Sequence, residues 1–447
     1  MASGKRSRAS SNGSDLLAIL FSALALLAPP DRYVAVPAAS APGPSRYDRV
    51  WVRKVGPPAA KRVLVLVPGV SGGSGGLVLI ARELVDRVPN LQIWIEDRRT
   101  QAFEDPYAFT RGNPAAAASY YLSNGTVDGR SFSILDGRSV PFVREWGLKV
   151  ALEDLRRVVL SARAGGKRTV ILGGHSLGAA TAVAYASWDF GGHAGSRDLT
   201  GLVLIDGGME GAFGTMPLAQ VKADVAKLQT SDPFYDRFGA GLPWLPGVFT
   251  EIGAQLAAFN PQGSSLLQLN PLLPDSYKPP FPVTNEAMLG YVFDGPTTPA
   301  SLRVHAGELA PAGDPRPWVD GELTPIANVS SAFGIEPGNA VEWYFPQRLV
   351  IDVFGVQGAL NGPTARFLGL KLTREAAIDV PLYALETDLT HGGVLRGAKR
   401  LIAHSKIPAG RSVLVAAHEE GHLDPLLAAP DRNRFLKTVV PFLRRLP

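Results

Sequence analysis

A serine in a glycine-rich turn is the residue best placed for chemistry in this sequence. Ser176 stands in GGHSLG (173–178), between an apolar run and the small-residue run 177–187. A nucleophile on a sharp strand-to-helix turn needs small residues two positions before and after it, because larger side chains would collide across the turn. Gly174 and Gly178 meet this requirement. The spacing predicts a nucleophilic serine at a helix N-terminus, where the helix dipole favours an oxyanion.

Such a serine needs a general base, and the chain has seven histidines. In sheets of this kind the base follows the last strand. His418 and His422 both follow the apolar run 412–417. We prefer His422, because its glycine-containing loop is long enough to reach back over the sheet, whereas His418 adjoins the strand and is expected to cap it or face solvent.

The segment HEEGH (418–422) also fits H-E-x-x-H, the pattern of zinc proteases. That chemistry needs both histidines on one helical face and a third ligand further along. Here the motif follows an apolar strand directly and contains glycine, and the acids beyond it, Asp424 and Asp431, lack the usual ligand spacing. The zinc hypothesis therefore ranks below the serine hypothesis, and no metal site is expected.

The third member of a serine triad is a carboxylate that orients the imidazole. It should lie between the serine and the histidine in the chain, just after a strand. Asp388 ranks first, because it lies three residues past the expected strand 380–385 and a turn could aim it at the histidine loop. Glu386, nearly on that strand, and Asp206, just after the expected strand 201–205, remain alternatives.

A second glycine-rich segment, VPGVSGGSGG (67–76), follows the first core strand and precedes a helix. Backbone N–H groups must approach the negative charge that develops on the substrate, and glycine-rich backbone allows this. We expect the N–H groups of Val70 and Leu177 to form the oxyanion hole. The segment lacks the Gly-Lys-Ser/Thr ending of a P-loop, and its glycines do not fit G-x-G-x-x-G.

Short apolar runs alternate with helical patterns around these motifs. Unbroken apolar strands between helices predict a doubly wound, mostly parallel sheet covered on both faces. The pattern breaks in a stretch rich in Pro, Gly and aromatic residues, too long to be structureless in a compact domain, so a cap or lid is expected there. The expected strands are 62–67, 91–96, 169–172, 201–205, 380–385 and 412–417, and the expected helices are 77–88, 148–164, 177–187, 394–404 and 432–445.

The N-terminus has the order of a secretory signal peptide. Basic residues come first, then the uncharged run 16–28, then small residues at 37–41. The run is shorter than the roughly 20 residues that span a membrane. We therefore expect a secreted or periplasmic protein, anchored if the segment is not cleaved. The predicted organisation is a signal peptide and leader at 1–41, core at 42–208, a cap at 209–375 and core again at 376–447.

Composition excludes several classes of protein. The 447 residues include no cysteine, which removes disulfides, thiolate metal sites and a cysteine nucleophile. An apolar content of 46% excludes global disorder. The net charge of +5 is spread along the chain without a strongly basic block beyond the N-terminus, so no nucleic-acid partner is expected.

Taken together, these segments resemble the α/β-hydrolase superfamily, specifically its serine esterases and lipases. The resemblance covers about 50–208 and 376–446, and rests on VLVLVPGVSGG, GGHSLGAA, GLVLIDGG, VPLYALETD and GHLDPL. It implies an eight-stranded sheet, a cap after the sixth strand, and acyl-enzyme hydrolysis without a cofactor. Two features depart from the family pattern: Pro68-Gly69 replaces the usual His-Gly, and ETDL lacks the usual glycine before the acid.

The leading hypothesis is an exported serine hydrolase acting on a small-molecule or lipid ester. The aromatic insertion is expected to line an acyl pocket or form a lid, with at least half of its aromatics serving as the cap's own core. It is also a candidate for transient contact with a membrane or lipid surface. A peptidase or amidase on the same triad is the main alternative, followed by a zinc protease and a non-catalytic binding protein. Acyl length and oligomeric state stay open at this point.

Overall fold

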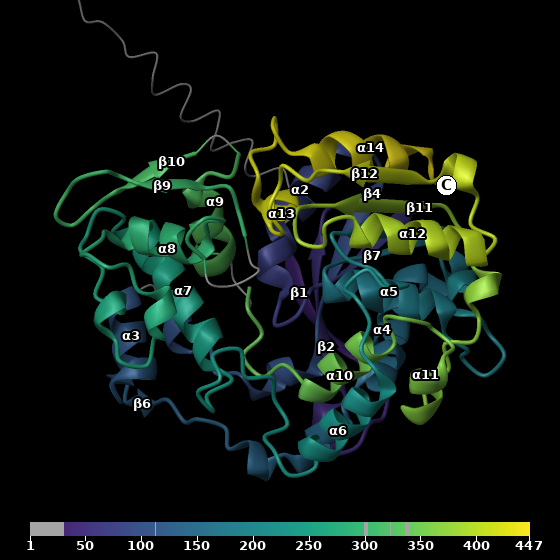
Figure 1. The fold of residues 1–447 in the computed structure, drawn as a ribbon, viewed down its shortest axis with the longest axis horizontal. Helices are drawn as coiled ribbons and strands as arrows, with labels where there is room; N and C mark the ends of the chain where they lie inside the picture. The colour runs from purple at the N-terminus through teal and green to yellow at the C-terminus, as the bar shows by residue number, and fades with distance from the viewer. Residues whose placement is uncertain (1–30, 112, 299–302, 322, 336–339) are drawn as a thin grey trace, which may run out of the picture.

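The centre of the molecule is an eight-stranded sheet with the order β1-β2-β4-β3-β7-β8-β11-β12 (Figure 1). The computed structural model describes residues 31–447 apart from 112, 299–302, 322 and 336–339. Neighbours from β4 to β12 run parallel, whereas β2 is antiparallel to β4 and β1 is antiparallel to β2. The strands are β1 (Arg32–Pro37), β2 (Arg49–Val55), β3 (Arg62–Val67), β4 (Leu91–Asp97), β7 (Thr169–His175), β8 (Gly201–Ile205), β11 (Leu382–Glu386) and β12 (Val413–Ala416).

Helices cover both faces of this sheet (Figure 1). Two buried apolar clusters result, one on each side of the strands. All five residues of β8 are buried, as expected for a strand covered on both faces. One face carries α4 (Leu148–Arg163), α5 (Leu177–Ser187) and α12 (Gly393–His404), and the other carries α2 (Val78–Arg87) and α14 (Arg434–Arg445).

The predicted doubly wound, mostly parallel sheet is confirmed. Strands 62–67 and 201–205 and helix 177–187 have the predicted bounds, and the other expected elements differ by at most three residues at either end. The sequence analysis did not anticipate β1 and β2. Both lie at the antiparallel edge, where β2 alternates buried and more exposed residues over much of its length and so lacks the unbroken apolar run of the central strands.

The expected leader 1–41 ends too late. Residues 32–37 form the edge strand β1, paired along its length with β2. Ala39 is buried, its N–H donates to Asp154 at 2.9 Å, and its carbonyl accepts from Arg99 at 2.9 Å. The small residues 37–41 therefore belong to the fold, and cleavage after them would remove a strand. The apolar run 16–28 lies outside the described residues, and no helix among those described is long and apolar enough to cross a membrane.

The chain between β8 and β11, where a cap was expected, forms a more composite arrangement than a single unit. Part of the chain between β8 and β11 packs beside α4, and part forms a separate helical lobe at the left of Figure 1. The lobe also includes a segment between β4 and α4, because α3 packs against α7. The helical lobe comprises α3 (Pro114–Leu122), β5 (Thr126–Val127), β6 (Arg130–Ser131), α7 (Leu245–Phe259), α8 (Asn285–Phe293), β9 (Gly307–Leu309), β10 (Trp318–Asp320) and α9 (Ile326–Ser330). In the other part, α10 (Gln347–Gly355) packs against α4, and α6 (Leu218–Leu228) and α11 (Pro363–Phe367) pack against α10.

Candidate active site

Ser176 occupies a strained turn between β7 and α5. Its φ of 57° and ψ of −124° lie outside the backbone regions that residues with a side chain ordinarily adopt. Its N–H donates to Ile205 O at 2.9 Å, which fixes the turn to the end of β8. A Cβ on Gly174 would lie 2.3 Å from Gly178 C, and a Cβ on Gly178 would lie 1.9 Å from Val67 O. The turn therefore requires both glycines. Gly174 is needed for the predicted reason, a collision across the turn, whereas Gly178 is needed because the turn packs against the end of β3.

His422 is held in place by a buried carboxylate, that of Asp206. Their Nδ1 and Oδ2 atoms are 2.6 Å apart, and the two side chains are 3% and 0% exposed. Thr387 also donates to Asp206, from its N–H at 2.8 Å and from its hydroxyl. Burial alone would raise the pKa of Asp206, but the hydrogen bonds from His422 and Thr387 bring it below its ordinary value. The carboxylate stays charged and can orient the imidazole.

The acid that the sequence analysis preferred, Asp388, does not contact His422. Its carboxylate faces Arg303 at 3.3 Å, and its N–H donates to Glu420 O. The carboxylate at His422 belongs instead to Asp206, which ranked last among the three candidates. Asp206 follows β8, the strand that lies between β7 and β11 in the sheet, so it stands directly beside the Ser176 turn.

The other candidate acid, Glu386, belongs to a separate pair. Its Oε1 lies 2.7 Å from His418 Nε2, and its Oε2 accepts from Leu395 N at 2.8 Å. Glu386 is fully buried, whereas the His418 side chain is 54% exposed. The segment 418–422 forms turns rather than a helix, and its two imidazoles have different carboxylate partners. It thus lacks the shared helical face on which the zinc-protease hypothesis depended.

His175, the residue before the serine, contacts the loop that carries His422. We call this segment (residues 417–423) the histidine loop. Its Nε2 lies 2.8 Å from His422 O, so this nitrogen must carry the hydrogen, because a carbonyl only accepts. Burial lowers the pKa of His175 to about 3. The ring is therefore neutral at ordinary pH and does not compete with His422 for a proton. No pattern in the sequence predicts this role for His175.

The expected oxyanion segment approaches Ser176 closely. A Cβ on Gly69 would lie 2.9 Å from Ser176 Cβ, so the glycine permits the approach. Val70 lines the same pocket as Ser176 and His422. Leu177 is the first residue of α5, where backbone N–H groups have no acceptor within the helix. Both expected donors thus stand beside Ser176.

A buried arginine braces this segment, which we call the oxyanion loop (residues 68–73). Arg98 donates to Pro68 O at 2.7 Å and lies 3.4–3.5 Å from the carbonyls of Gly69 and Gly72. It also pairs with Glu342 Oε2 at 2.9 Å. Arg98 directly follows β4, so its position at the carboxyl edge of the sheet was available from the sequence.

Glu342 belongs to a segment that returns from the lobe and lies alongside the oxyanion loop. Its N–H donates to Ser71 O at 2.8 Å, and Gly73 N–H donates to Ala340 O at 2.9 Å. Burial raises the pKa of Glu342, against the opposing charge of Arg98. The return segment (340–343) therefore adds a short strand-like bridge to the loop that should hold the substrate oxygen.

Two pockets meet at this place. The catalytic pocket, of about 590 Å³, is lined by the oxyanion loop, His175, Ser176 and His422. The lobe pocket, of about 720 Å³, is lined largely by apolar side chains of α7, α8 and the segment between them. Of the aromatics expected to line an acyl pocket, Phe249 does so, whereas Trp244, Trp343, Tyr344 and Phe345 are at most 2% exposed and form core.

One group of side chains in the described ranges could offer ligands to a metal. Donor atoms of Glu210, Glu375 and His404 all lie within 4.8 Å of one another. The group joins the start of the chain beyond β8, the segment before β11 and the end of α12. None of the three lines the pocket that contains Ser176.

No family model and no curated protein sequence matches this chain. Among solved structures, a Sulfolobus solfataricus protein described as a candidate lipase has a TM-score of 0.51 and 16% identity, over 92% of this chain and 93% of that chain. A thermophilic esterase from Thermogutta terrifontis has a TM-score of 0.40 and 12% identity, over 93% and 98%. A monoacylglycerol lipase from Paleococcus ferrophilus has a TM-score of 0.40 and 14% identity, over 88% and 98%. At these identities the likeness concerns the fold.

Proposed function

Because the chain has the α/β-hydrolase fold, we propose that it is a serine hydrolase that cleaves carboxylic esters through an acyl-enzyme. One observation carries the proposal. Ser176, on its strained turn, and His422, hydrogen-bonded to the buried Asp206, line the same pocket beside the oxyanion loop. These are the nucleophile, the base, the orienting acid and the oxyanion site that acyl transfer needs.

In this proposal each group has one step. His422 Nε2 takes the proton of the Ser176 hydroxyl as its oxygen bonds to the acyl carbon. The carbonyl oxygen becomes an oxyanion, to which the N–H groups of Val70 and Leu177 donate. The bond to the alcohol oxygen then breaks, and His422 gives that oxygen its proton. Water repeats the sequence on the acyl-enzyme, while Asp206 remains ionised and holds the imidazole by Nδ1–H.

The lobe pocket favours an ester with an apolar acyl part over a peptide. Its lining is largely aliphatic and aromatic and offers few hydrogen-bond partners for a peptide backbone. Cleavage of amides on the same triad is the second candidate and an outcome of the assay below.

We also propose transient contact with a lipid surface beside this pocket. Leu266 and Leu269 are 71% and 72% exposed, and Phe259 is 59% exposed. Leu267 and Leu273, from the same stretch, line the pocket instead. Co-sedimentation with phospholipid vesicles should therefore weaken in a Leu266→Ser, Leu269→Ser double variant. Equal sedimentation of both proteins would contradict the proposal.

We propose export from the order of basic and then apolar residues that precede the edge strand β1. Because β1 is part of the sheet, the mature chain should retain Arg32. Mass spectrometry of protein recovered from the periplasm or medium checks both points. An N-terminus beyond residue 37 in an active protein would contradict the retained strand.

The deciding experiment uses p-nitrophenyl esters and anilides of matched acyl groups. Wild type should release p-nitrophenol from the esters faster than p-nitroaniline from the anilides. A fluorophosphonate should attach to Ser176, as read by peptide mass. Ser176→Ala should lose both activity and labelling, with its thermal unfolding unchanged. Activity that survives Ser176→Ala would refute the serine mechanism, and faster anilide cleavage would favour an amidase.

A further inference from the structure

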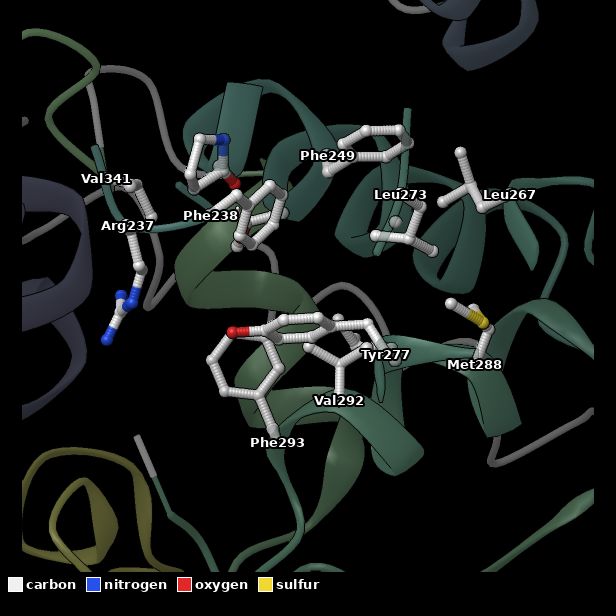
Figure 2. A pocket seen from close by; sticks show the side chains of 14 residues that line it. Arg237, Phe238, Phe249, Leu267, Leu273, Tyr277, Met288, Val292, Phe293 and Val341 are labelled. Atoms are coloured by element: carbon white, nitrogen blue, oxygen red, sulfur yellow. Dashed lines mark hydrogen bonds between the residues drawn. The ribbon is translucent and has the colours of Figure 1, made fainter. Parts of the chain in front are cut away.

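The catalytic pocket and the lobe pocket share two lining residues, Arg237 and Val341. Figure 2 shows both at one end of the lobe pocket, with the Arg237 guanidinium turned away from Phe249, Leu267 and Leu273. A ligand that extends from Ser176 into the lobe must therefore pass this arginine. Val341 lies in the return segment, opposite Gly72 of the oxyanion loop, so the junction adjoins the expected oxyanion site.

Arg237 has no acidic partner among the described residues. No Asp or Glu from those ranges lines either pocket, and the groups that raise the pKa of Arg237 are the hydroxyls of Tyr277 and Tyr235 rather than carboxylates. Burial lowers the pKa of Arg237, yet a guanidinium remains protonated in proteins. A partly buried cation without a counter-ion is costly, and cations in such places are normally paired. The missing anion is therefore a property to look for in the ligand.

We propose that the preferred substrate is an anionic amphiphilic ester, whose apolar chain fills the lobe pocket and whose carboxylate or phosphate binds Arg237 beside the scissile bond. The inference rests on the proposed ester hydrolysis and narrows its substrate class. The apolar lining accounts for the chain. The position of Arg237 at the junction of the pockets places the anionic group close to the ester rather than at the far end of the chain.

The guanidinium suits this role because of its shape as well as its charge. Its planar fork can donate two parallel hydrogen bonds to a carboxylate or a phosphate, which a lysine ammonium does not do. Water is scarcer at a pocket junction than on an open surface, so the ion pair gains strength there. An uncharged ester would leave the cation unpaired and should be a poorer substrate.

The test compares anionic and neutral esters that share one acyl chain. The phosphate pair is 1-dodecanoyl-glycerol 3-phosphate with 1-dodecanoyl-glycerol, and the carboxylate pair is O-dodecanoyl-lactate with its methyl ester. Each is assayed below its critical micelle concentration by release of dodecanoic acid. The readout is the ratio of kcat/KM for the anionic ester to that for the neutral one. The variants are Arg237→Gln and Arg237→Lys, with Lys278→Gln as the control.

Lys278→Gln is a matched control because this substitution also removes one positive charge, from a residue in the same part of the chain. Lys278 pairs with Asp275 at 2.8 Å and does not line the lobe pocket. In wild type and in Lys278→Gln the ratio should exceed about ten in at least one pair, as expected for a charge-assisted hydrogen bond. Arg237→Gln should lower the ratio at least about tenfold, and Arg237→Lys should give an intermediate value. The pair with the larger loss identifies carboxylate or phosphate as the bound group.

Three outcomes would overturn the proposal. The first is a ratio near one in wild type. The second is an unchanged ratio in Arg237→Gln with both rates lowered, which would make Arg237 a general stabiliser of the oxyanion. The third is an equal loss of the ratio in Lys278→Gln. In all three cases cleavage of the neutral ester by wild type leaves the serine hydrolase intact, whereas no cleavage of any ester refutes the proposed function itself.

Discussion

The carboxyl edge of the sheet and the helical lobe hold polar groups in opposite ways. At the edge, Asp206 is fully buried and accepts from His422 and twice from Thr387. In the lobe pocket the lining is apolar, and its one cation, Arg237, has no acid partner among the described residues. A buried polar group whose hydrogen bonds are all made within the protein is held rigidly, whereas one without such partners can still bind a ligand. In the function that we propose, the core therefore carries the chemistry and the lobe carries the selectivity.

The two regions are nevertheless joined by the return segment 340–343. It bridges to the oxyanion loop through Gly73 and Ser71, and its Glu342 pairs with Arg98. A second connection runs from His305, just before β9, to Asp424 beside the histidine loop, with the two side chains 2.6 Å apart. Substitutions can therefore be chosen that change only the core, only the return segment, only the contact between His305 and Asp424, or only the lobe.

The largest effect should follow from Asp206→Asn. An asparagine cannot hold His422 in the required tautomer or stabilise its charged form, and loss of such an acid lowers kcat by about 10⁴-fold. Asp388→Asn is the matched control, because Asp388 faces Arg303 and should change kcat by less than about threefold. Steady-state kinetics on a p-nitrophenyl ester measures both. A larger loss in Asp388→Asn would mean that the working enzyme uses a different acid.

The next effect should come from Arg98→Lys, which keeps the charge but loses the fork that holds the oxyanion loop. Displaced oxyanion donors should lower kcat by about tenfold to hundredfold, while KM changes less. Arg99→Lys is the control, since Arg99 is also buried and pairs with Asp154, Asp48 and the Ala39 carbonyl rather than with the oxyanion loop. Both variants should unfold at lower temperature, and Arg98→Lys alone should lose kcat. Equal losses of kcat would assign the effect to stability.

Short-range patterns in the sequence are enough to predict two residues that the structure brings to one pocket. Ser176 is specified by two glycines at fixed spacing, and His422 by its place after the last strand. The acid ranked first is not the one that contacts His422, because Asp206, Glu386 and Asp388 all lie at or just beyond the ends of parallel strands, and local sequence does not say which carboxylate turns toward the histidine. That choice depends on Thr387, whose two hydrogen bonds anchor Asp206 from the neighbouring strand.

Two other features depend on contacts that are distant in the sequence. The edge strand 32–37 is short, and four of its six residues are exposed, so its sequence cannot be told from that of a leader. Its pairing with β2 is what identifies it as a strand. Helix α3 joins the lobe by packing on α7, far along the chain. Local sequence does not indicate which carbonyl groups an arginine after a strand will contact. The role of Arg98 at the three carbonyls of the oxyanion loop was therefore not predicted.

A tenfold effect confined to the lobe should follow from Met288→Trp. Met288 lines the lobe pocket, and Figure 2 shows it beyond Leu273 from Arg237. The larger indole should fill the deep part of the pocket, so kcat/KM for a dodecanoyl ester should fall about tenfold relative to a butanoyl ester. Comparing p-nitrophenyl esters of both lengths measures this. A uniform loss for both esters would show that the chain lies elsewhere.

The smallest effect concerns the connection between His305 and Asp424. The hydrogen bond to Asp424 raises the pKa of His305 above its ordinary value, although burial opposes this. Because the folded pKa exceeds the unfolded one, the stabilising contribution is complete below the unfolded pKa of about 6.5 and is lost as pH rises through the folded value.

His305→Gln should therefore lower the unfolding temperature at pH 6 by about 1–3 °C, a small shift because half of the imidazole is exposed and solvent screens the pair. The difference from wild type should disappear near pH 9. His391→Asn is the control, since His391 is exposed, has no acid partner in the described ranges, and has a positive φ that asparagine tolerates. It should give no pH-dependent difference. A deficit of His305→Gln that grows toward alkaline pH would mean that neutral His305, rather than its charged form, connects the lobe to the histidine loop.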